Sequence, residues 1–322
     1  MDYTILVTDD RFGNYKIEEN ILSDYSADIV INTSGSIEEY KRWAEKADAL
    51  LTNMFTLDAE ALSYLKRCKI ISRYGIGYDN VDVEAASRLG IWVARVPDYC
   101  GNEVAEHGIG LILALLRKIP IIDTEVRNGK WNIHSRYSIP RLAGKTLGVI
   151  GYGTTGKQMV KRLAAFKPKR ILVADSNPPE EEISKLGAEV SCFSEIIEES
   201  DIISLHVPLR NENKHLINES VLKRMKNSAY LVNTSRGGIV DTQALVRALQ
   251  TDEIAGAALD VFEEEPPAGC KELMKLHNVI VTDHAAYYSQ DSVTELKEKA
   301  ALNIRDVLNG YPPRFPVNSL FP

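Results

Sequence analysis

The sequence predicts an α/β protein built from two doubly wound, Rossmann-like domains, each with a parallel sheet, and with a cleft between them. Three observations lead to this prediction. Short β-rich runs alternate with amphipathic helical stretches along the chain, which is the pattern of βαβ units. A long helical stretch interrupts this alternation once, after which it resumes. The chain has 322 residues, more than a single core normally accommodates, so two domains are expected.

The first assembly is expected within residues 1–100. Its strand-like runs lie at 4–7, 28–31, 49–52, 70–72 and 92–96, and amphipathic helical stretches lie at 37–47 and 57–66. A long helix is predicted next, from about Asn102 to Arg127, with Asn102 as N-cap, Gly129 as stop signal and Pro120 as a kink or break. The turn-rich segment that follows contains Trp131, which we expect to pack against the protein.

The second assembly begins near residue 146. Strands are predicted at 146–150, 170–175, 202–206, 229–233, 254–259 and 279–282, and a helix at 155–166. The last helix, at about 290–308, follows the final strand, so it can return to the first domain. We therefore expect a discontinuous substrate domain of residues 1–100 and 290–322 around a nucleotide-binding domain of residues 101–289.

The composition favours a globular protein of the cytoplasm. Hydrophobic residues make up 44% of the chain and charged residues 26%, which is typical of a folded domain. The net charge of −7 and the lack of a basic run disfavour nucleic acid as a partner. The four cysteines form no C-x-x-C pair, so neither a metal site nor a disulfide framework is expected. No apolar stretch is long enough to span a membrane, and the first residues lack a signal-peptide profile.

A glycine-rich loop, Gly151-Tyr152-Gly153-Thr154-Thr155-Gly156, joins a predicted strand to a predicted helix. In a dinucleotide-binding loop the first glycine permits a tight turn, the second lets the backbone approach the pyrophosphate, and the third permits close helix–strand packing. The helix N-terminus offers free N–H groups to the phosphates. The alternative is a purely structural turn, and the strand–loop–helix context argues against it.

Asp175 ends the next predicted strand, 19 residues after Gly156. A carboxylate there can accept hydrogen bonds from the hydroxyl groups of the adenosine ribose. Ser176 and Asn177 follow, and neither can pair with a 2′-phosphate as an arginine would. The sequence therefore favours NAD(H) over NADP(H).

Three residues near the ends of strands in the second assembly are the catalytic candidates: Arg236, Glu265 and His284. A guanidinium can bind a carboxylate through two parallel hydrogen bonds, and a histidine paired with a carboxylate can donate a proton near neutral pH. Each has an ordinary alternative, namely a solvated arginine, a glutamate in an acidic run that faces water, and a packed histidine. Among the other histidines, His206 could lie near the cofactor, His107 is expected to pack within its helix, and His134, His215 and His277 are expected to be solvated.

Four segments resemble the D-isomer-specific 2-hydroxyacid dehydrogenase family, and the resemblance runs over nearly the whole chain. They are residues 73–82 (RYGIGYDNVD), the loop 151–156, residues 231–238 (LVNTSRGG) and residues 256–266 (GAALDVFEEEP). Residues 96–100 and 284–289 are most similar to the branch that includes the C-terminal-binding proteins and phosphoglycerate dehydrogenase-like enzymes.

The resemblance implies an enzyme that interconverts a 2-hydroxy acid and a 2-keto acid by hydride transfer with NAD. It implies that Arg236 holds the substrate, His284 is the acid/base and Glu265 pairs with His284. The backbone of Tyr74, Gly75, Ile76 and Gly77 would grip the substrate carboxylate. Asp260 would lie near the nicotinamide, and Tyr287 would line the substrate pocket. Val207, Pro208, Thr234, Ser235, Arg236 and His284 would lie along the cofactor. A homodimer built through the nucleotide domain is also implied.

This chain departs from the family pattern at several positions. Thr154 and Thr155 stand where the family commonly has Arg-Ile or a similar pair, so a guanidinium contact to phosphate is lost. Two outcomes are open: the threonine hydroxyls substitute for that contact, or the affinity for the cofactor falls. Asp283 stands where proline usually precedes the acid/base histidine, and its charge could raise the pKa of His284. The related corepressors have a tryptophan where this chain has Tyr287.

Alternative functions stay open at this level. The same scaffold serves NAD(H)-sensing corepressors, although this sequence offers little room for a regulatory tail. It also serves formate- and phosphonate-type dehydrogenases. Glyoxylate, hydroxypyruvate and 3-phosphoglycerate are all compatible substrates.

Overall fold

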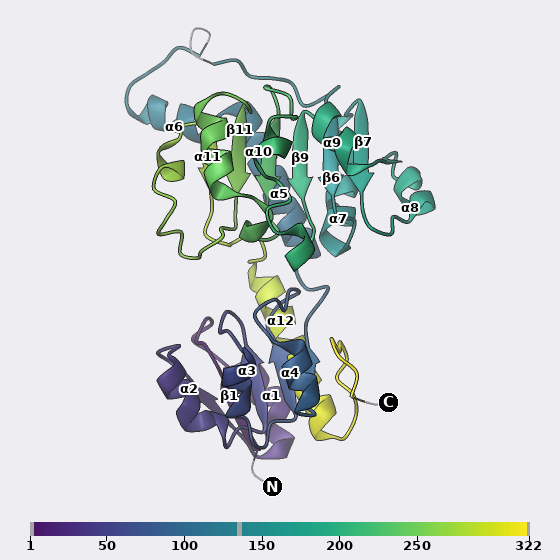
Figure 1. Cartoon of the computed structure of the whole chain (residues 1–322). Helices are drawn as coiled ribbons and strands as arrows, with labels where there is room; N and C mark the ends of the chain where they lie inside the picture. The colour runs from purple at the N-terminus through teal and green to yellow at the C-terminus, as the bar shows by residue number, and fades with distance from the viewer. Residues whose placement is uncertain (1–2, 134–136, 321–322) are drawn as a thin grey trace. The chain divides into compact units, whose positions relative to one another are not determined.

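The computed structural model describes residues 3–133 and 137–320, and the chain forms two compact α/β units (Figure 1). The first unit comprises Met1–Tyr99 and Ser289–Pro322, and the second comprises Cys100–Tyr288. Each unit contains one sheet whose paired strands are all parallel in the described part of the chain. The prediction of two Rossmann-like units is thereby confirmed.

The first unit has a five-stranded sheet with the strand order β2-β1-β3-β4-β5. Its strands are β1 (Tyr3–Val7), β2 (Ala27–Ile31), β3 (Ala49–Thr52), β4 (Ile70–Arg73) and β5 (Trp92–Ala94). Its helices are α1 (Lys16–Leu22), α2 (Ile37–Ala44), α3 (Ala59–Ser63), α4 (Val83–Arg88) and α12 (Gln290–Leu308). All residues of β3 and β4 are buried, as expected for central parallel strands covered on both faces.

The last long helix completes the first unit. Ser289 caps α12 through its side chain, which accepts a hydrogen bond from the Ser292 N–H. The Ser72 hydroxyl of β4 donates to the Ala300 carbonyl at 2.9 Å, so the C-terminal helix is bonded directly to a central strand. The prediction that this helix returns to the first assembly is therefore correct.

The second unit has a seven-stranded sheet with the order β12-β11-β10-β9-β6-β7-β8. Its strands are β6 (Thr146–Ile150), β7 (Arg170–Ala174), β8 (Glu189–Val190), β9 (Ile202–Leu205), β10 (Tyr230–Asn233), β11 (Gly256–Leu259) and β12 (Val279–Val281). Its helices are α5 (Gly101–Arg117), α6 (Ile119–Arg127), α7 (Thr154–Leu163), α8 (Glu180–Lys185), α9 (Phe193–Glu199), α10 (Glu219–Leu222) and α11 (Thr242–Gln250). The chain order reverses at β6, which lies between β7 and β9, and ligands of open α/β sheets bind at the carboxyl end of such a reversal.

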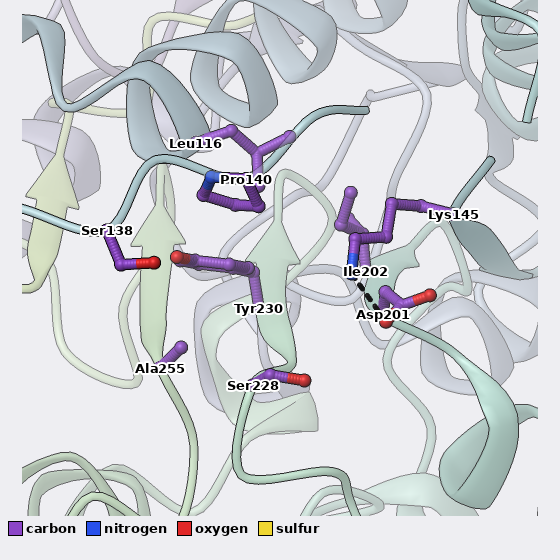
Figure 2. A pocket seen from close by; sticks show the side chains of 9 residues that line it. All are labelled: Leu116, Ser138, Pro140, Lys145, Asp201, Ile202, Ser228, Tyr230 and Ala255. Carbon is purple, nitrogen blue, oxygen red and sulfur yellow. Dashed lines mark hydrogen bonds and ion pairs between the residues drawn. The ribbon is translucent and has the colours of Figure 1, made fainter. Parts of the chain in front are cut away.

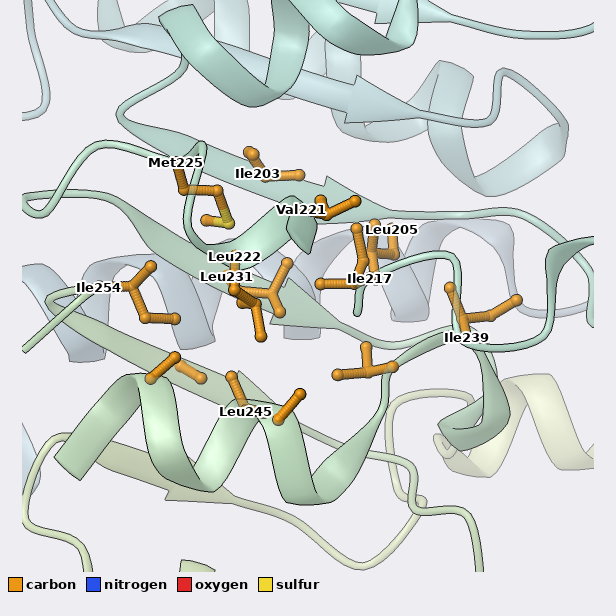
Figure 3. Close-up of a cluster of buried hydrophobic side chains, with 14 of the residues drawn as sticks. Ile203, Leu205, Ile217, Val221, Leu222, Met225, Leu231, Ile239, Leu245 and Ile254 are labelled. Carbon is orange, nitrogen blue, oxygen red and sulfur yellow. The ribbon is translucent and has the colours of Figure 1, made fainter. Parts of the chain in front are cut away.

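Apolar side chains cover both faces of this sheet. Figure 3 shows one face, where Ile203 and Leu205 of β9, Leu231 of β10 and Leu245 of α11 belong to one cluster of buried side chains. Val149, Val173 and Val232 belong to a separate cluster that includes residues of α5 and α7. Because both faces are covered, the strands consist almost entirely of apolar residues, and that is why the sequence revealed them.

The long helix predicted from Asn102 to Arg127 is divided in two. Lys118 separates α5 from α6 in a left-handed conformation (φ 56°), and Pro120 lies in the first turn of α6. A proline is tolerated in a first turn, where no intrahelical partner for its nitrogen is lost. The N-cap position belongs to Cys100 rather than Asn102, so that prediction was wrong by two residues. Gly129 follows α6 with a φ of 78°, as its predicted stop role requires.

Trp131 and His134, in the segment after α6, were expected to be packed and solvated, respectively. Trp131 does not pack against the protein, because its side chain is 87% exposed. His134 lies outside the described residues. None of the helices in the described ranges combines the length and apolar character that crossing a bilayer requires.

Candidate active site

The glycine loop lies at the carboxyl end of β6, and its three glycines differ in what the structure requires of them. Gly151 has a φ of 97°, and a Cβ there would come within 2.6 Å of the His206 backbone. A Cβ on Gly156 would lie 2.0 Å from the Gly151 carbonyl oxygen. Gly153 has ordinary dihedral angles and nothing within 4 Å of a built Cβ. The first and third glycines are therefore required by packing, whereas the second faces open space.

The open space at Gly153 fits the approach of a pyrophosphate. Gly153 is the N-cap of α7 and supplies no side-chain cap, so the first N–H groups of this helix have no capping side chain at that position. Thr154 and Thr155 occupy the first turn, Thr154 exposed and Thr155 half-buried. A helix N-terminus of this kind attracts anions, and two hydroxyl groups stand beside it.

Asp175 lies directly after β7, beside the glycine loop. Its carboxylate accepts hydrogen bonds from the Tyr152 N–H at 2.7 Å and the Asn177 N–H at 3.0 Å. Partial burial raises the pKa of Asp175, but the bonds from Asn177, Tyr152 and Ser176 outweigh it and hold the pKa below its usual value. The carboxylate is thus ionised and fixed against the loop, as a ribose acceptor needs to be.

His206 lies closer to the loop than the sequence indicated. It follows β9, its N–H donates to the Ile150 carbonyl at 2.7 Å, and its ring bonds to the Ser204 hydroxyl at 2.8 Å. Burial lowers the pKa of His206 to about 4, so the ring is neutral near pH 7. Val207 and Pro208 follow at the same edge of the sheet.

His284 and Glu265 form a hydrogen-bonded pair in the second unit. The distance from His284 Nδ1 to Glu265 Oε2 is 2.7 Å. Glu265 Oε1 accepts a further bond from the Phe262 N–H at 3.0 Å, which fixes the carboxylate. Burial raises the pKa of Glu265, but the bond and charge of His284, the Phe262 N–H and the charge of Arg236 bring it below its usual value. This is the geometry of an acid/base histidine oriented by a carboxylate.

Arg236 lies in the loop after β10, the strand next to β11. The side-chain amide of Asn233 donates to the Arg236 carbonyl at 2.9 Å, and Arg236 Nη1 donates to the Ser235 carbonyl at 2.9 Å. A Cβ on Gly237 would lie 1.8 Å from the Phe262 carbonyl carbon, so this loop packs tightly against the segment that carries Glu265. Thr234 is buried and Ser235 is bonded to Asn233.

Asp260, at the end of β11, is the centre of a polar network. Its carboxylate accepts bonds from the Thr282 hydroxyl at 2.6 Å and from the N–H groups of Ala285 and Ala286 at 2.8 and 3.0 Å. The His107 ring bonds to the Thr282 hydroxyl at 3.0 Å. Thr282 was not predictable as a site residue, and His107 was expected only to pack, because their contact joins positions 175 residues apart.

The acidic run at 263–265 is mostly paired rather than solvated. Besides Glu265, Glu263 bonds to His215 at 2.6 Å and accepts from the Thr242 N–H at 2.9 Å. His215 is therefore not simply solvated, contrary to the prediction, whereas Glu264 and His277 are exposed.

The segment Tyr74–Gly77 lies after β4 in the first unit. Gly75 has a φ of 145°, and a Cβ there would overlap the Arg73 side chain. Tyr74 is buried, its hydroxyl donates to Glu18 at 2.6 Å and its N–H donates to the Thr52 carbonyl at 2.8 Å, so neither group is available for a ligand. Among the described residues, the N–H groups of Ile76 and Gly77 have no protein acceptor, which suits them to a carboxylate.

Tyr287 lies beside His284 in the second unit. The two rings meet edge-on, with centroids 6.1 Å apart. Asp283 is exposed, so water screens much of its charge. The candidates that the structure brings together in the second unit are thus Arg236, Asp260, Glu265 and His284, with Tyr287 at the edge of the histidine ring.

A pocket of about 210 Å³ lies away from these residues (Figure 2). It is found where β9, β10 and β11 begin, and Tyr230 and Ile202 contribute to its wall. The glycine loop and the catalytic candidates follow the opposite, carboxyl ends of the strands. This pocket is therefore separate from the candidate active site.

Comparisons with known proteins point to one enzyme family. The model of the D-isomer specific 2-hydroxyacid dehydrogenase NAD-binding domain matches residues 109–286. A glyoxylate reductase of Thermofilum pendens is 40% identical over 299 residues, which cover 90% of this chain and 88% of the relative. A D-3-phosphoglycerate dehydrogenase of Archaeoglobus fulgidus is 37% identical over 292 residues, which cover 90% of this chain but 55% of the relative.

A solved structure agrees with these similarities. The D-lactate dehydrogenase of Aquifex aeolicus, in complex with NAD and lactic acid, superposes with a TM-score of 0.87 and 30% identity. The match covers 95% of this chain and 96% of that one. Both the fold and the length of this chain are therefore similar to those of an enzyme whose structure contains NAD and lactic acid.

Proposed function

This chain belongs to the D-isomer specific 2-hydroxyacid dehydrogenase family, and from that premise we propose that it reduces glyoxylate to the corresponding 2-hydroxy acid. It is an NAD-dependent oxidoreductase that interconverts a 2-keto acid and a D-2-hydroxy acid. Similarity to a glyoxylate reductase over most of both chains supports glyoxylate as the substrate. The phosphoglycerate dehydrogenase relative is weaker support, because this chain spans about half of it.

The observation that carries the mechanism is the 2.7 Å bond between His284 and Glu265. NADH, when bound, would supply the hydride for reduction of the keto carbon. His284, as imidazolium, donates its Nε2 proton to the carbonyl oxygen, and Glu265 stabilises that charged form through Nδ1. Arg236 binds the substrate carboxylate and orients the carbonyl. In the reverse direction, His284 takes the hydroxyl proton.

We assign cofactor binding to the second unit, which also supplies the substrate contacts of Arg236 and His284. Gly151, Gly153 and Gly156 with the N-terminus of α7 would receive the pyrophosphate, and Asp175 the ribose. The residues expected along the remaining length of the cofactor are Thr154, Thr155, Val207, Pro208, Thr234, Ser235 and Asp260. In the first unit, the N–H groups of Ile76 and Gly77 are our candidates for binding a carboxylate. In the second unit, Tyr287 would border the reacting centre beside the ring of His284.

An NADH-oxidation screen tests the proposed substrate. Glyoxylate, hydroxypyruvate, pyruvate and 3-phosphohydroxypyruvate are compared by kcat/KM, each with NADH and with NADPH. We expect glyoxylate to give the highest value with NADH. A higher kcat/KM for the phosphorylated acid would overturn the substrate, and a preference for NADPH would contradict the role of Asp175.

We also propose that the enzyme is a homodimer in which a second copy covers α6. This helix buries none of its residues, although Ile119 and Val126 on it are apolar and are 54% and 42% exposed. Trp131, just beyond it, is exposed as well. Exposed apolar patches of this kind usually mark an interface. Light scattering after size exclusion should give a dimer, and Ile119→Glu with Val126→Glu should give a monomer.

We also propose that the protein is located in the cytoplasm. Its support is chemical, since within the described residues no disulfide joins Cys68, Cys100, Cys192 or Cys270, as expected in a reducing compartment. Fractionation of cells that express the full chain would test it. Recovery in the extracellular fraction would contradict it.

A further inference from the structure

A second carboxylate–histidine pair lies beside the first in the second unit. His107 on α5 has its Nε2 atom 3.0 Å from the Thr282 hydroxyl oxygen and 3.6 Å from Asp260 Oδ1. The Thr282 oxygen in turn lies 2.6 Å from Asp260 Oδ1. Three side chains from α5, the end of β12 and the end of β11 are thus connected in one chain of contacts.

The directions of these hydrogen bonds follow from the chemistry of the groups. A carboxylate has no proton to donate, and that of Asp260 also accepts from two backbone N–H groups. Thr282 must therefore donate its single hydroxyl proton to Asp260. The Thr282 oxygen is then left to accept from His107. His107 must therefore carry a proton on Nε2, and it is a donor in this network.

The burial of Asp260 makes each donor important. The carboxylate is only 1% exposed, and a buried charge is costly unless hydrogen bonds or an opposite charge compensate it. It accepts hydrogen bonds from the Thr282 hydroxyl and from the N–H groups of Ala285 and Ala286. His107 supports the first of these, and its Nε2 atom lies 3.6 Å from Asp260 Oδ1.

Asp260 also holds the backbone that carries the acid/base histidine. The His284 N–H donates to the Asp260 carbonyl at 2.8 Å, and the next two N–H groups donate to the Asp260 carboxylate. His284 itself is left-handed, with a φ of 55°, a conformation that residues with a side chain adopt uncommonly. Asp260 holds this backbone along three consecutive residues.

We infer that His107 is a positioning residue: through Thr282 and Asp260 it holds the turn at 284–286, so that His284 meets the substrate in productive geometry. Glu265 fixes the ring of His284, whereas His107 fixes its backbone. This inference rests on the proposed acid/base role of His284. It assigns to α5, through a side chain remote in sequence, a direct influence on the chemical step.

Substitution of His107 tests the inference by kinetics in the full-length enzyme. His107→Leu removes the donor, and we expect kcat to fall by about tenfold to a hundredfold, because small displacements of a catalytic group have effects of this size. The isotope effect on kcat with NADH deuterated at the transferred position should rise, since chemistry becomes slower than product release. His107→Gln, whose amide N–H can replace Nε2–H, should recover most of kcat and the original isotope effect.

Two further variants locate the path and control for the helix. Thr282→Val removes the bridging hydroxyl, and the His107→Leu/Thr282→Val double variant should lose no more activity than the worse single variant, because both break one chain of contacts. Glu106→Gln is the control for the helix, because Glu106 lies next to His107 on α5 and pairs with Arg162 at the surface. Its kcat and isotope effect should equal those of the unsubstituted enzyme.

A purely structural role for His107 would give a different result. In that case His107→Leu would lower the melting temperature and the active fraction, with no change in the isotope effect and no rescue by glutamine, and the inference would be overturned. Additive losses in the double variant would overturn it too. Failure of the proposed function is recognisable separately, because the unsubstituted enzyme would then oxidise no NADH, or His284→Ala would keep full turnover.

Discussion

His284 is the residue at which the geometry and the proposed chemistry coincide. Glu265 is bonded to its ring and Asp260 to its backbone. The sequence could indicate both His284 and Glu265, since each belongs to a short motif. It could not indicate that Asp260 binds three successive N–H groups around His284, because that arrangement depends on the adjacency of β11 and β12.

Replacement of His284 by alanine should remove the proton donor and leave cofactor binding intact. General acid catalysis is worth about 10²–10⁴-fold, so kcat for 2-keto acid reduction should fall by that amount in His284→Ala. The Kd for NADH, measured by fluorescence titration, should stay within about twofold, since this side chain contributes little of the cofactor's total binding energy. Turnover equal to that of the unsubstituted enzyme would remove His284 from the mechanism.

Asp175 should determine the choice between NADH and NADPH. In Asp175→Ala the affinity for NADH should drop by about tenfold, because one charge-assisted bond to ribose is lost. The relative kcat/KM for NADPH should increase, since the repulsion of a 2′-phosphate is removed. Glu181→Gln, on the exposed side of nearby α8, serves as the control and should change neither value. An unaltered NADH/NADPH ratio in Asp175→Ala would contradict the assignment.

The glycine loop and α7 form the element that joins fold to cofactor, and two of its glycines can be tested against each other. Gly156→Ala should destabilise the unliganded enzyme, because the new methyl group meets the Gly151 carbonyl at 2.0 Å. Gly153→Ala meets nothing and should keep its melting temperature, yet bind NADH more weakly where the pyrophosphate approaches. Calorimetry without and with NADH separates the two effects. Equal melting temperatures for the two unliganded variants would contradict this division of roles.

At the level of elements, the buried strands were predictable and the helix boundaries less so. β3, β6 and α12 have the predicted ends, because apolar runs and a serine cap mark them clearly. The break at Lys118 was not predictable in position, since a lysine carries no signal for a left-handed conformation. Trp131 was misjudged because an aromatic side chain in a sequence does not reveal whether its partner belongs to the same chain.

At the level of the whole molecule, His206 should make stability sensitive to acid. Its pKa is lowered to about 4 by burial, below the ordinary value of 6.5, so the unfolded chain binds the extra proton first. The neutral ring therefore contributes fully above pH 6.5, and this contribution is lost as the pH falls toward 4. From about pH 7 to about pH 5 the free energy of unfolding should drop by roughly 2 kcal/mol on this account.

Denaturant unfolding of the enzyme and of His206→Gln at both pH values checks this expectation. Glutamine has no titrating group, so the variant should lack most of that pH-dependent loss. An identical pH dependence in the two proteins would mean that His206 does not titrate as its burial indicates.

The division of the first unit in the sequence has a consequence for biosynthesis. Its sheet is encoded before residue 100, but α12, which bonds to β4 through Ser72 and Ala300, is made after residue 288. During translation the continuous second unit can close while the earlier strands still wait for their covering helix. The nascent chain therefore exposes an unfinished apolar sheet for the time needed to synthesise about two hundred residues, and this is the interval in which chaperones would be needed most.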